Sequence, residues 1–385
     1  MAKSLSNAVG YLAVDVYDQL RRARTKKHSN VICSPLSLAA ALAMTLGGAR
    51  AKTAEELYAV LRAKEGRTHQ FFASFMLKLT SQDASPDINI VNRIYSDERL
   101  VIQASYKEFL NTHYGSEIIP VDFANKYESV HAEINQWVKI MTDQLMKNFL
   151  PRDSISPSTS VLLVSAMHFS GTWESPFLAR STSRQDFHFS TKHKVKVDMM
   201  YQKQDFAVSH SAVLKARAIE LPYRGRKSSM IILLPDDIEG LHHLERHLSM
   251  PALLDLLGGL NDLSDVKLSV PKLVVHQCQS YKSVLTTMGI TELFSDSCDL
   301  SGIFTEAKPK ISDVVHKAFL RIDEEGTEGA SATAAMICPT TGLARGPPVD
   351  FVVDHPFMLL VVHTKPDVVL FVGSVRKPEQ IENVC

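Results

Sequence analysis

The sequence predicts an α+β protein built on large mixed β-sheets. Helical periodicity dominates the first third of the chain, and strand-like apolar runs dominate from residue 160 onward. Several of these runs are apolar at nearly every position, as expected for strands covered on both faces. Helices first and strands later do not fit regular β-α-β alternation. No Pro-, Gly- or Ser-rich linker and no internal repeat divides the chain, so we expect one domain over residues 1–385.

The expected helices follow from apolar spacing and from start and stop signals. Residues 34–49 combine a Ser-Pro start, a helix-forming run and a Gly-Gly stop. The other helices are predicted at residues 5–24, 53–63, 104–115, 129–150 (closed by Pro151), 241–248, 249–259 and 281–290. The strand-like runs are residues 160–170, 194–202, 212–223, 228–237, 266–275, 350–364 and 367–378.

Composition limits the function classes. Lys and Arg together number 42, as do Asp and Glu, so no overall charge favours nucleic acid or an anionic membrane. The five cysteines are scattered without a C-x-x-C pair, which argues against a disulfide framework or a cysteine zinc site. The first residues carry Asp15 and Asp18 and do not form the apolar core of a signal peptide. No apolar run is long enough to span a membrane.

The chain contains none of the G-x-S-x-G, H-E-x-x-H, phosphate-loop or G-x-G-x-x-G motifs, which argues against an enzyme. His242, His243 and His247 cluster on one predicted helix, but a solvated helix face explains them better than a metal site. We therefore expect no metal and no cofactor. Cys338 reads as an incidental exposed thiol. A basic run at the end of the first helix is a weak candidate for a heparin-like polyanion, through Arg21, Arg22, Arg24, Lys26 and Lys27.

Residues 324–348 form the one stretch that favours a function. The segment begins with charged residues, continues through small ones and ends in Pro, Gly and a lone Arg. Long loops without secondary structure are usually functional or disordered. Because Thr327, Gly329, Ser331 and Thr333 are small at alternate positions, this segment could enter an existing sheet as a new strand.

Motifs along nearly the whole chain resemble those of the serpins, the serine protease inhibitor family. The matching segments, in the family's order, are NVICSPLSLAAALAMTLGGA from Asn30, INQWVKIMT from Ile134, AMHFSGTWESPF from Ala166, VDMMYQ from Val197, ELPY from Glu220, LLPDD from Leu233, MGI from Met288, DLSGI from Asp299, VVHKAFLRIDEEGTEGASAT from Val314, and DHPFMLLV from Asp354. The resemblance implies three β-sheets, about nine helices and an exposed reactive loop, here residues 324–350. A protease that attacks the loop forms an acyl-enzyme and is trapped when the loop inserts into the main sheet, a conformational switch for which serpins are a standard example.

The resemblance assigns a hinge and two structural sites. The hinge comprises Glu324, Glu325, Gly326, Thr327, Glu328, Gly329 and Ala330. The shutter and breach of the main sheet comprise Asn30, Ser34, Ser37, Ser165, Trp173 and His316. Two residues depart from the family pattern: Ser165 stands where an Asn is usual, and Gly329 replaces an Ala, which weakens an inserted strand by roughly 0.5–1 kcal/mol.

The position of the scissile bond has two solutions. Counting the family's usual spacing from Glu324 leads to Thr340–Thr341, and counting back from the DHPF motif leads to Arg345–Gly346. We expect Arg345–Gly346, because a trypsin-like protease needs a long cation in its specificity pocket. With that choice Pro339 lies in the inserting limb, where it cannot donate to a strand ladder. The loop is also longer than usual, so we expect slower or leakier complexes.

The leading expectation is an inhibitor, not an enzyme, that forms covalent complexes with trypsin-like serine proteases of clotting, complement or digestion. The alternatives are a non-inhibitory carrier or chaperone, and an inhibitor of elastase-like or chymotrypsin-like proteases cleaved at Thr340–Thr341 or Leu343–Ala344. We expect a monomer that binds neither nucleic acid nor membrane. An extracellular location is expected, because an arginine at the scissile bond suits extracellular proteases and a leader would have been removed. The cytoplasm is the alternative, because the chain contains no N-x-S/T sequon.

Overall fold

The computed structural model describes residues 2–63, 67–79, 87–142, 144–146, 148–327, 347–364 and 367–379. It confirms the α+β class. Nine α-helices lie in this described part: α1 (Ala2–Ala23), α2 (Pro35–Gly48), α3 (Ala51–Leu61), α4 (Thr68–Leu79), α5 (Ala104–Tyr114), α6 (Phe123–Met141), α7 (Leu241–His247), α8 (Met250–Gly258) and α9 (Lys282–Thr287). None of them is both long enough and apolar enough to cross a membrane.

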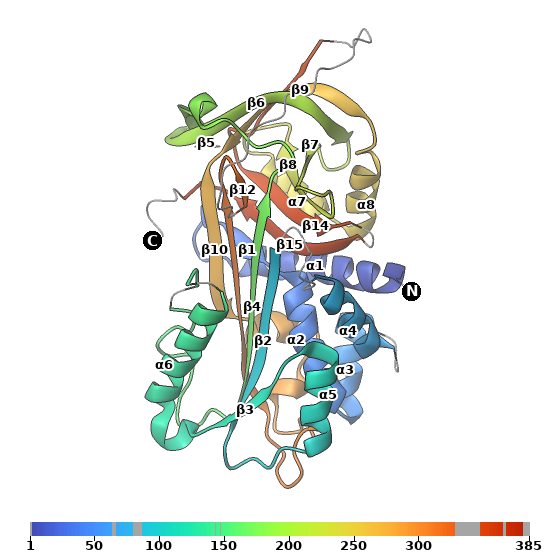
Figure 1. Ribbon diagram of the computed structural model, residues 1–385, viewed down its shortest axis with the longest axis vertical. Helices are drawn as coiled ribbons and strands as arrows, with labels where there is room; N and C mark the ends of the chain where they lie inside the picture. The colour runs from blue at the N-terminus through green and yellow to red at the C-terminus, as the bar shows by residue number, and fades with distance from the viewer. Residues whose placement is uncertain are drawn as a thin grey trace.

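The strands are β1 (Val31–Cys33), β2 (Asp87–Asp97), β3 (Ile118–Val121), β4 (Val161–Thr172), β5 (Ser183–Ser190), β6 (His193–Ser211), β7 (Ala216–Pro222), β8 (Ser228–Pro235), β9 (Leu263–Pro271), β10 (Leu273–Ser280), β11 (Ile311–Ile322), β12 (Gly326–Thr327), β13 (Val349–Val352), β14 (Phe357–His363) and β15 (Val368–Val375). Long strands β10, β4 and β2 run vertically in Figure 1, with α6 at the lower left and α2 to α5 at the lower right. Strands β5 to β9 and helix α8 form the upper part.

The strands form two hydrogen-bonded networks where three sheets were expected. The six-stranded sheet has the order β10-β11-β4-β2-β3, with β12 added to β4. The nine-stranded sheet has the order β1-β15-β14-β8-β7-β6-β9-β13, with β5 added to β6. The long strand β6 explains the difference, because residues 199–207 pair with β9 and residues 208–211 pair with β7. One strand thus joins what would otherwise be two sheets.

Strand β4 of the six-stranded sheet is buried on both faces. Leu162, Val164 and Ala166 of β4 belong to a cluster with Ile134 and Val138 of α6. The alternate residues of β4, such as Leu163 and Met167, belong to the larger core. Side chains of a strand alternate between the two faces, which explains why the sequence of β4 is apolar at nearly every position.

Several predicted elements differ from the structure. Helix α6 ends at Met141, well before the predicted stop at Pro151. Residues 266–275 are not one strand, because the chain leaves β9 at Pro271 and enters β10, in the other sheet, at Leu273. Helix α4 and strand β2 were not predicted. Strand β2 lies within the third of the chain that the sequence indicated as mostly helical.

Candidate functional site

The six-stranded sheet has an opening between β4 and β11. These strands pair in parallel from Ile311↔Val161 to Ala318↔Met167, and the upper end of β4 pairs instead with β12. There Gly326 lies opposite Thr172 and Thr327 lies opposite Gly171, in antiparallel register. The beginning of the predicted hinge therefore already occupies the place of an added strand.

Thr327 is fully buried in this position. Its Oγ1 atom lies 2.7 Å from the hydroxyl of Tyr223, which is itself buried. The first residues of the predicted hinge are therefore paired with β4 and buried. A Cβ atom on Gly326 would lie 2.0 Å from the carbonyl oxygen of Gly171, so the close pairing of β12 with β4 requires glycine at this position.

Asp323 shapes the turn that leads into the hinge. Its Oδ1 atom accepts hydrogen bonds from the backbone N–H groups of Glu325 (3.0 Å) and Gly326 (3.2 Å). Its Oδ2 atom lies 3.1 Å from the Nε of Arg321. The backbone N–H of Asp323 donates to the carbonyl of Gly326 at 2.9 Å. The Asp323 carboxylate thus accepts the hydrogen bonds of N–H groups that have no strand partner in the turn. The sequence analysis did not predict this role of Asp323.

Glu324 anchors the same turn from outside. Its carboxylate lies 2.7 Å from Lys272 Nζ and accepts a hydrogen bond from Thr182 Oγ1 at 2.8 Å. Burial disfavours the charged form, but the contacts with Lys272 and Thr182 outweigh it and lower the pKa of Glu324. Because the carboxylate side chain is only 14% exposed, the pair is shielded from most of the solvent screening that weakens surface ion pairs.

Trp173 joins the hinge to the upper sheet. Its indole Nε1 donates to the carbonyl of Asp323 at 3.0 Å, and its backbone N–H donates to Glu325 at 2.9 Å. The ring stacks on Tyr223 with centroids 4.6 Å apart. The stacked pair Trp173 and Tyr223 therefore contacts the chain at Asp323, Glu325 and Thr327.

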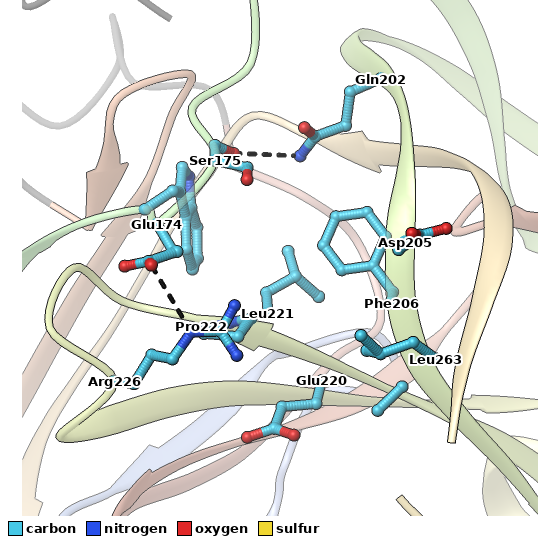
Figure 2. A pocket seen from close by; sticks show the side chains of 12 residues that line it. Glu174, Ser175, Gln202, Asp205, Phe206, Glu220, Leu221, Pro222, Arg226 and Leu263 are labelled. Atoms are coloured by element: carbon cyan, nitrogen blue, oxygen red, sulfur yellow. Dashed lines mark hydrogen bonds and ion pairs between the residues drawn. The ribbon is translucent and has the colours of Figure 1, made fainter. Parts of the chain in front are cut away.

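A small cavity of about 70 Å³, open to solvent, lies beside Trp173. Figure 2 shows that the Gln202 amide reaches Ser175 and that Arg226 reaches Glu174 across it. The hydrogen bond from Gln202 Nε2 to the Ser175 carbonyl is 3.3 Å long. These contacts hold Glu174 and Ser175, in the segment that follows β4.

The predicted shutter residues meet below the opening. Ser34 N–H donates to His316 Nε2 at 3.1 Å, so the proton of the imidazole is on Nδ1, which lies 2.9 Å from Ser165 Oγ. Ser165 Oγ lies 2.9 Å from Ser37 Oγ, which donates to the carbonyl of Ala166 or to the side chain of Asn92, each at 3.2 Å. Since His316 and Ser165 are paired across β11 and β4, this chain of hydrogen bonds crosses the two strands that must separate.

His316 is neutral in this setting. Burial lowers its pKa to about 3, because no anion compensates the desolvated imidazolium. The Tyr281 ring lies edge-on at a centroid distance of 5.2 Å. A neutral imidazole satisfies one donor and one acceptor here, whereas a protonated one would lose the bond from Ser34.

Asn30, which was grouped with the shutter and breach, contacts the segment after β15. Its side-chain oxygen accepts the backbone N–H groups of Arg376 (2.8 Å) and Lys377 (3.1 Å), and its amide donates to the Lys377 carbonyl at 2.9 Å. The amide side chain thus fixes the chain that follows β15. The remaining predicted positions lie outside the described residues: Glu328, Gly329, Ala330, Cys338, Thr340, Thr341, Leu343, Ala344, Arg345 and Gly346.

The predicted histidine cluster shows no metal geometry. His243 and His247 stack at 4.0 Å, and the Nδ1 atom of His247 lies 2.9 Å from the His243 carbonyl. Across the described ranges no group of three His, Cys, Asp or Glu side chains could hold a metal ion.

Comparison with known proteins decides the family. The family model described as Serpin (serine protease inhibitor) matches residues 7–378. The chain belongs to the serpin family. Individual serpins align with almost the whole chain. It is 43% identical to Iris of Ixodes ricinus and 32% identical to leukocyte elastase inhibitor of Homo sapiens, each over 98% of this chain and 100% of the relative.

Solved serpin structures have the same fold. The crystal structure of Serpin48 from the insect Tenebrio molitor, described as highly specific, superimposes with a TM-score of 0.86 at 30% identity. The match covers 98% of this chain and 99% of that one. The serpin fold predicted from the sequence motifs is therefore confirmed, and the chain is a member of a family of protease inhibitors.

Proposed function

We propose that this serpin, as a single domain over residues 1–385, inhibits trypsin-like serine proteases through a reactive loop at about residues 324–350 that is cleaved at Arg345–Gly346. The observation that carries the proposal is the pairing of Gly326 and Thr327 with the end of β4. Gly326 and Thr327 form an antiparallel strand beyond the point where the parallel pairing of β4 with β11 ends, and further loop residues can follow them there.

The register of β12 predicts how far the loop can enter. In the pairs Gly326↔Thr172 and Thr327↔Gly171 the two residue numbers add up to 498. If the same register continues, each further loop residue i would face residue 498 − i of β4. Thr333 would then lie opposite Ser165 in the shutter, and Ile337 would lie opposite Val161, the first residue of β4. Pro339 falls beyond the end of the strand, so it costs no ladder hydrogen bond.

The small residues of the loop suit this path. Thr327 is buried, and Gly329, Ser331 and Thr333 would share its face of the sheet. Entry would separate β4 from β11 and break the contact between Ser165 and His316. Thr333 would bring a hydroxyl to the same level, where it can replace the lost hydrogen bond.

The decisive experiment is incubation with trypsin followed by denaturing electrophoresis. We expect a complex that survives denaturation and a released peptide that begins at Gly346. Arg345→Ala should abolish the trypsin complex, and Arg152→Ala, at an exposed arginine outside residues 324–350, should leave it unchanged. Trypsin inhibition that persists in Arg345→Ala would refute the assigned bond.

Cleavage at Thr340–Thr341 or Leu343–Ala344 by an elastase-like or chymotrypsin-like protease is a second candidate. It is favoured by the 32% identity to a leukocyte elastase inhibitor. A released peptide that begins at Thr341 or Ala344 would establish it. Absence of complexes with every protease of a panel would instead favour a carrier or chaperone, against which the small-residue hinge and buried Thr327 argue.

An extracellular site of action is part of the proposal, since an arginine bait suits extracellular proteases; the cytoplasm is the alternative. Detection of the chain in the culture medium or in the cell lysate of its source tissue distinguishes the two.

A further inference from the structure

The small cavity beside Trp173 lies where strand β6 leaves strand β7. The two strands pair only as far as Val208↔Ile219, and a continued register would bring residues 205–207 opposite residues 220–222. Residues 205–207 pair with β9 instead, and the cavity is lined by both of these stretches, which no longer pair with each other. The change of partner along β6 therefore opens a wedge between β6 and β7, and the cavity occupies this wedge.

The walls of the wedge are largely apolar. Phe206 of β6 and Leu221 of β7 line the cavity, as Figure 2 shows, and both are buried. Leu263 of β9 also lines it and is 56% exposed. A volume of about 70 Å³ offers room for about five water-sized groups, since one water needs roughly 10–15 Å³ of such space. A short apolar stem therefore fits the cavity.

One polar atom of the lining has no partner among the described residues. Gln202 Oε1 is buried and accepts no hydrogen bond there, whereas Nε2 of the same amide donates to the Ser175 carbonyl. Leaving a buried acceptor unsatisfied is costly. The wedge therefore favours a ligand that brings a hydrogen-bond donor.

The lining carries an excess of negative charge. Its charged side chains are the carboxylates of Glu174, Asp205 and Glu220 and the single guanidinium of Arg226. The Arg226 Nε atom lies 3.5 Å from Glu174 Oε1, so this cation is already directed toward one of the carboxylates. Charges of one sign around a cavity concentrate ions of the opposite sign in it. A cation therefore suits this cavity better than an anion does.

We propose that the cavity binds a small organic cation, a primary ammonium ion on a short apolar stem. The stem lies between Phe206 and Leu221, and the ammonium group donates to Gln202 Oε1. The indole of Trp173, which has one face on Tyr223, adds an aromatic wall of the kind that attracts cations. A neutral alcohol supplies the donor without the charge, and a carboxylate supplies neither. The site does not include the reactive loop, so it is independent of the proposed inhibition.

The test is titration of Trp137→Phe with butylammonium at constant ionic strength, followed by tryptophan fluorescence. The chain has two tryptophans, so only Trp173 emits in this variant. We expect its emission to change with a dissociation constant on the order of 1–10 mM, as suits so small a ligand. 1-Butanol should bind at least about threefold more weakly, and butyrate should not bind. No binding of butylammonium would overturn the site, and equal binding of 1-butanol would overturn the choice of a cation.

Variants of the lining test which residues hold the ligand. Asp205→Asn combined with Glu220→Gln should weaken butylammonium binding on the order of threefold to tenfold. Gln202→Glu should strengthen it, a gain that a poorly folded variant would not show. The matched control, Glu108→Gln combined with Asp237→Asn, removes two exposed carboxylates outside the lining and should bind normally. Equal weakening in both double variants, or weaker binding by Gln202→Glu, would overturn the assignment.

The same ammonium chemistry occurs in free amines and in the lysine side chains of proteins. We assign the site to a free amine, because the stem and head of such a molecule fill about 70 Å³ without a peptide backbone. Nα-acetyl-lysine methylamide should therefore bind more weakly than butylammonium, and tighter binding of the lysine compound would overturn this choice. Arg345→Ala should bind butylammonium normally whether or not that variant inhibits trypsin, so the two proposals fail separately.

Discussion

The neutral shutter histidine predicts a specific loss of stability between pH 7 and pH 5. His316 has a native pKa of about 3, and an unfolded chain protonates histidine near 6.5. Lowering the pH therefore adds a proton to the unfolded state and almost none to the native state, so stability falls as the pH drops below about 6.5. Integrating between pH 7 and pH 5 gives a contribution of about 2 kcal/mol from this one group.

Urea unfolding at both pH values measures the effect. His316→Gln lacks the titrating group, so the difference between the two pH values should be smaller by about 2 kcal/mol than in the unmodified chain. His242→Gln removes an exposed imidazole and serves as the control. If His316→Gln loses as much stability between pH 7 and pH 5 as the unmodified chain, burial between β11 and β4 does not keep this histidine neutral.

The hinge supports three further predictions. Thr327→Arg should turn the inhibitor into a substrate, since a cation cannot take the buried position beside Tyr223; cleaved chain without a denaturation-stable complex is the expected gel pattern. Gly326→Ala should displace β12 from Gly171 and weaken complex formation in the same assay, whereas unchanged inhibition would show that β12 tolerates a Cβ atom. Glu324→Lys should lower the urea midpoint, because it places two cations together at Lys272. Adding Lys272→Glu should restore part of the lost stability. If the double variant is no more stable than the single one, the ion pair does not stabilise the hinge.

Much of the fold was predictable because its strands and helices follow local patterns. Helix α2 begins where Ser34 caps the N–H of Ser37, as the Ser-Pro signal indicated. The predicted end of α6 was wrong because the helix ends at Met141 without a proline or glycine to mark the stop. Strand β2 was missed because polar side chains such as Asn89 and Asn92 interrupt its pattern. Both point to tertiary partners, the carbonyl of Met141 and Ser37.

The candidate site divides in the same way. The hinge and most shutter residues could be found because they lie in motifs of the family, and the structure brings Ser34, Ser37, Ser165 and His316 together. Their contacts with the rest of the chain could not be found. Lys272 and Tyr223 have no local signal, since each contacts a hinge residue that is far away in the sequence. Asp323 does have one, because it accepts from N–H groups two and three residues later, as Asp commonly does in turns, and that signal was overlooked. The contact of Asn30 with Arg376 could not be found either, since the two residues are far apart in the sequence.

The register of β12 also sharpens the choice between the two scissile bonds. If insertion ends at Ile337, opposite the start of β4, residues 338–345 remain as a tether of roughly 26 Å at about 3.3 Å per residue when cleavage follows Arg345. Cleavage after Thr340 would leave roughly 10 Å. A longer tether pulls less on the bound protease, so the arginine bond should trap it less completely and consume more than one inhibitor per protease inactivated. Deleting residues 338–342 shortens the tether without touching the hinge or Arg345, and should bring that ratio toward one. A ratio near one in the unmodified chain would mean that insertion continues past Ile337, and that Pro339 enters the sheet after all.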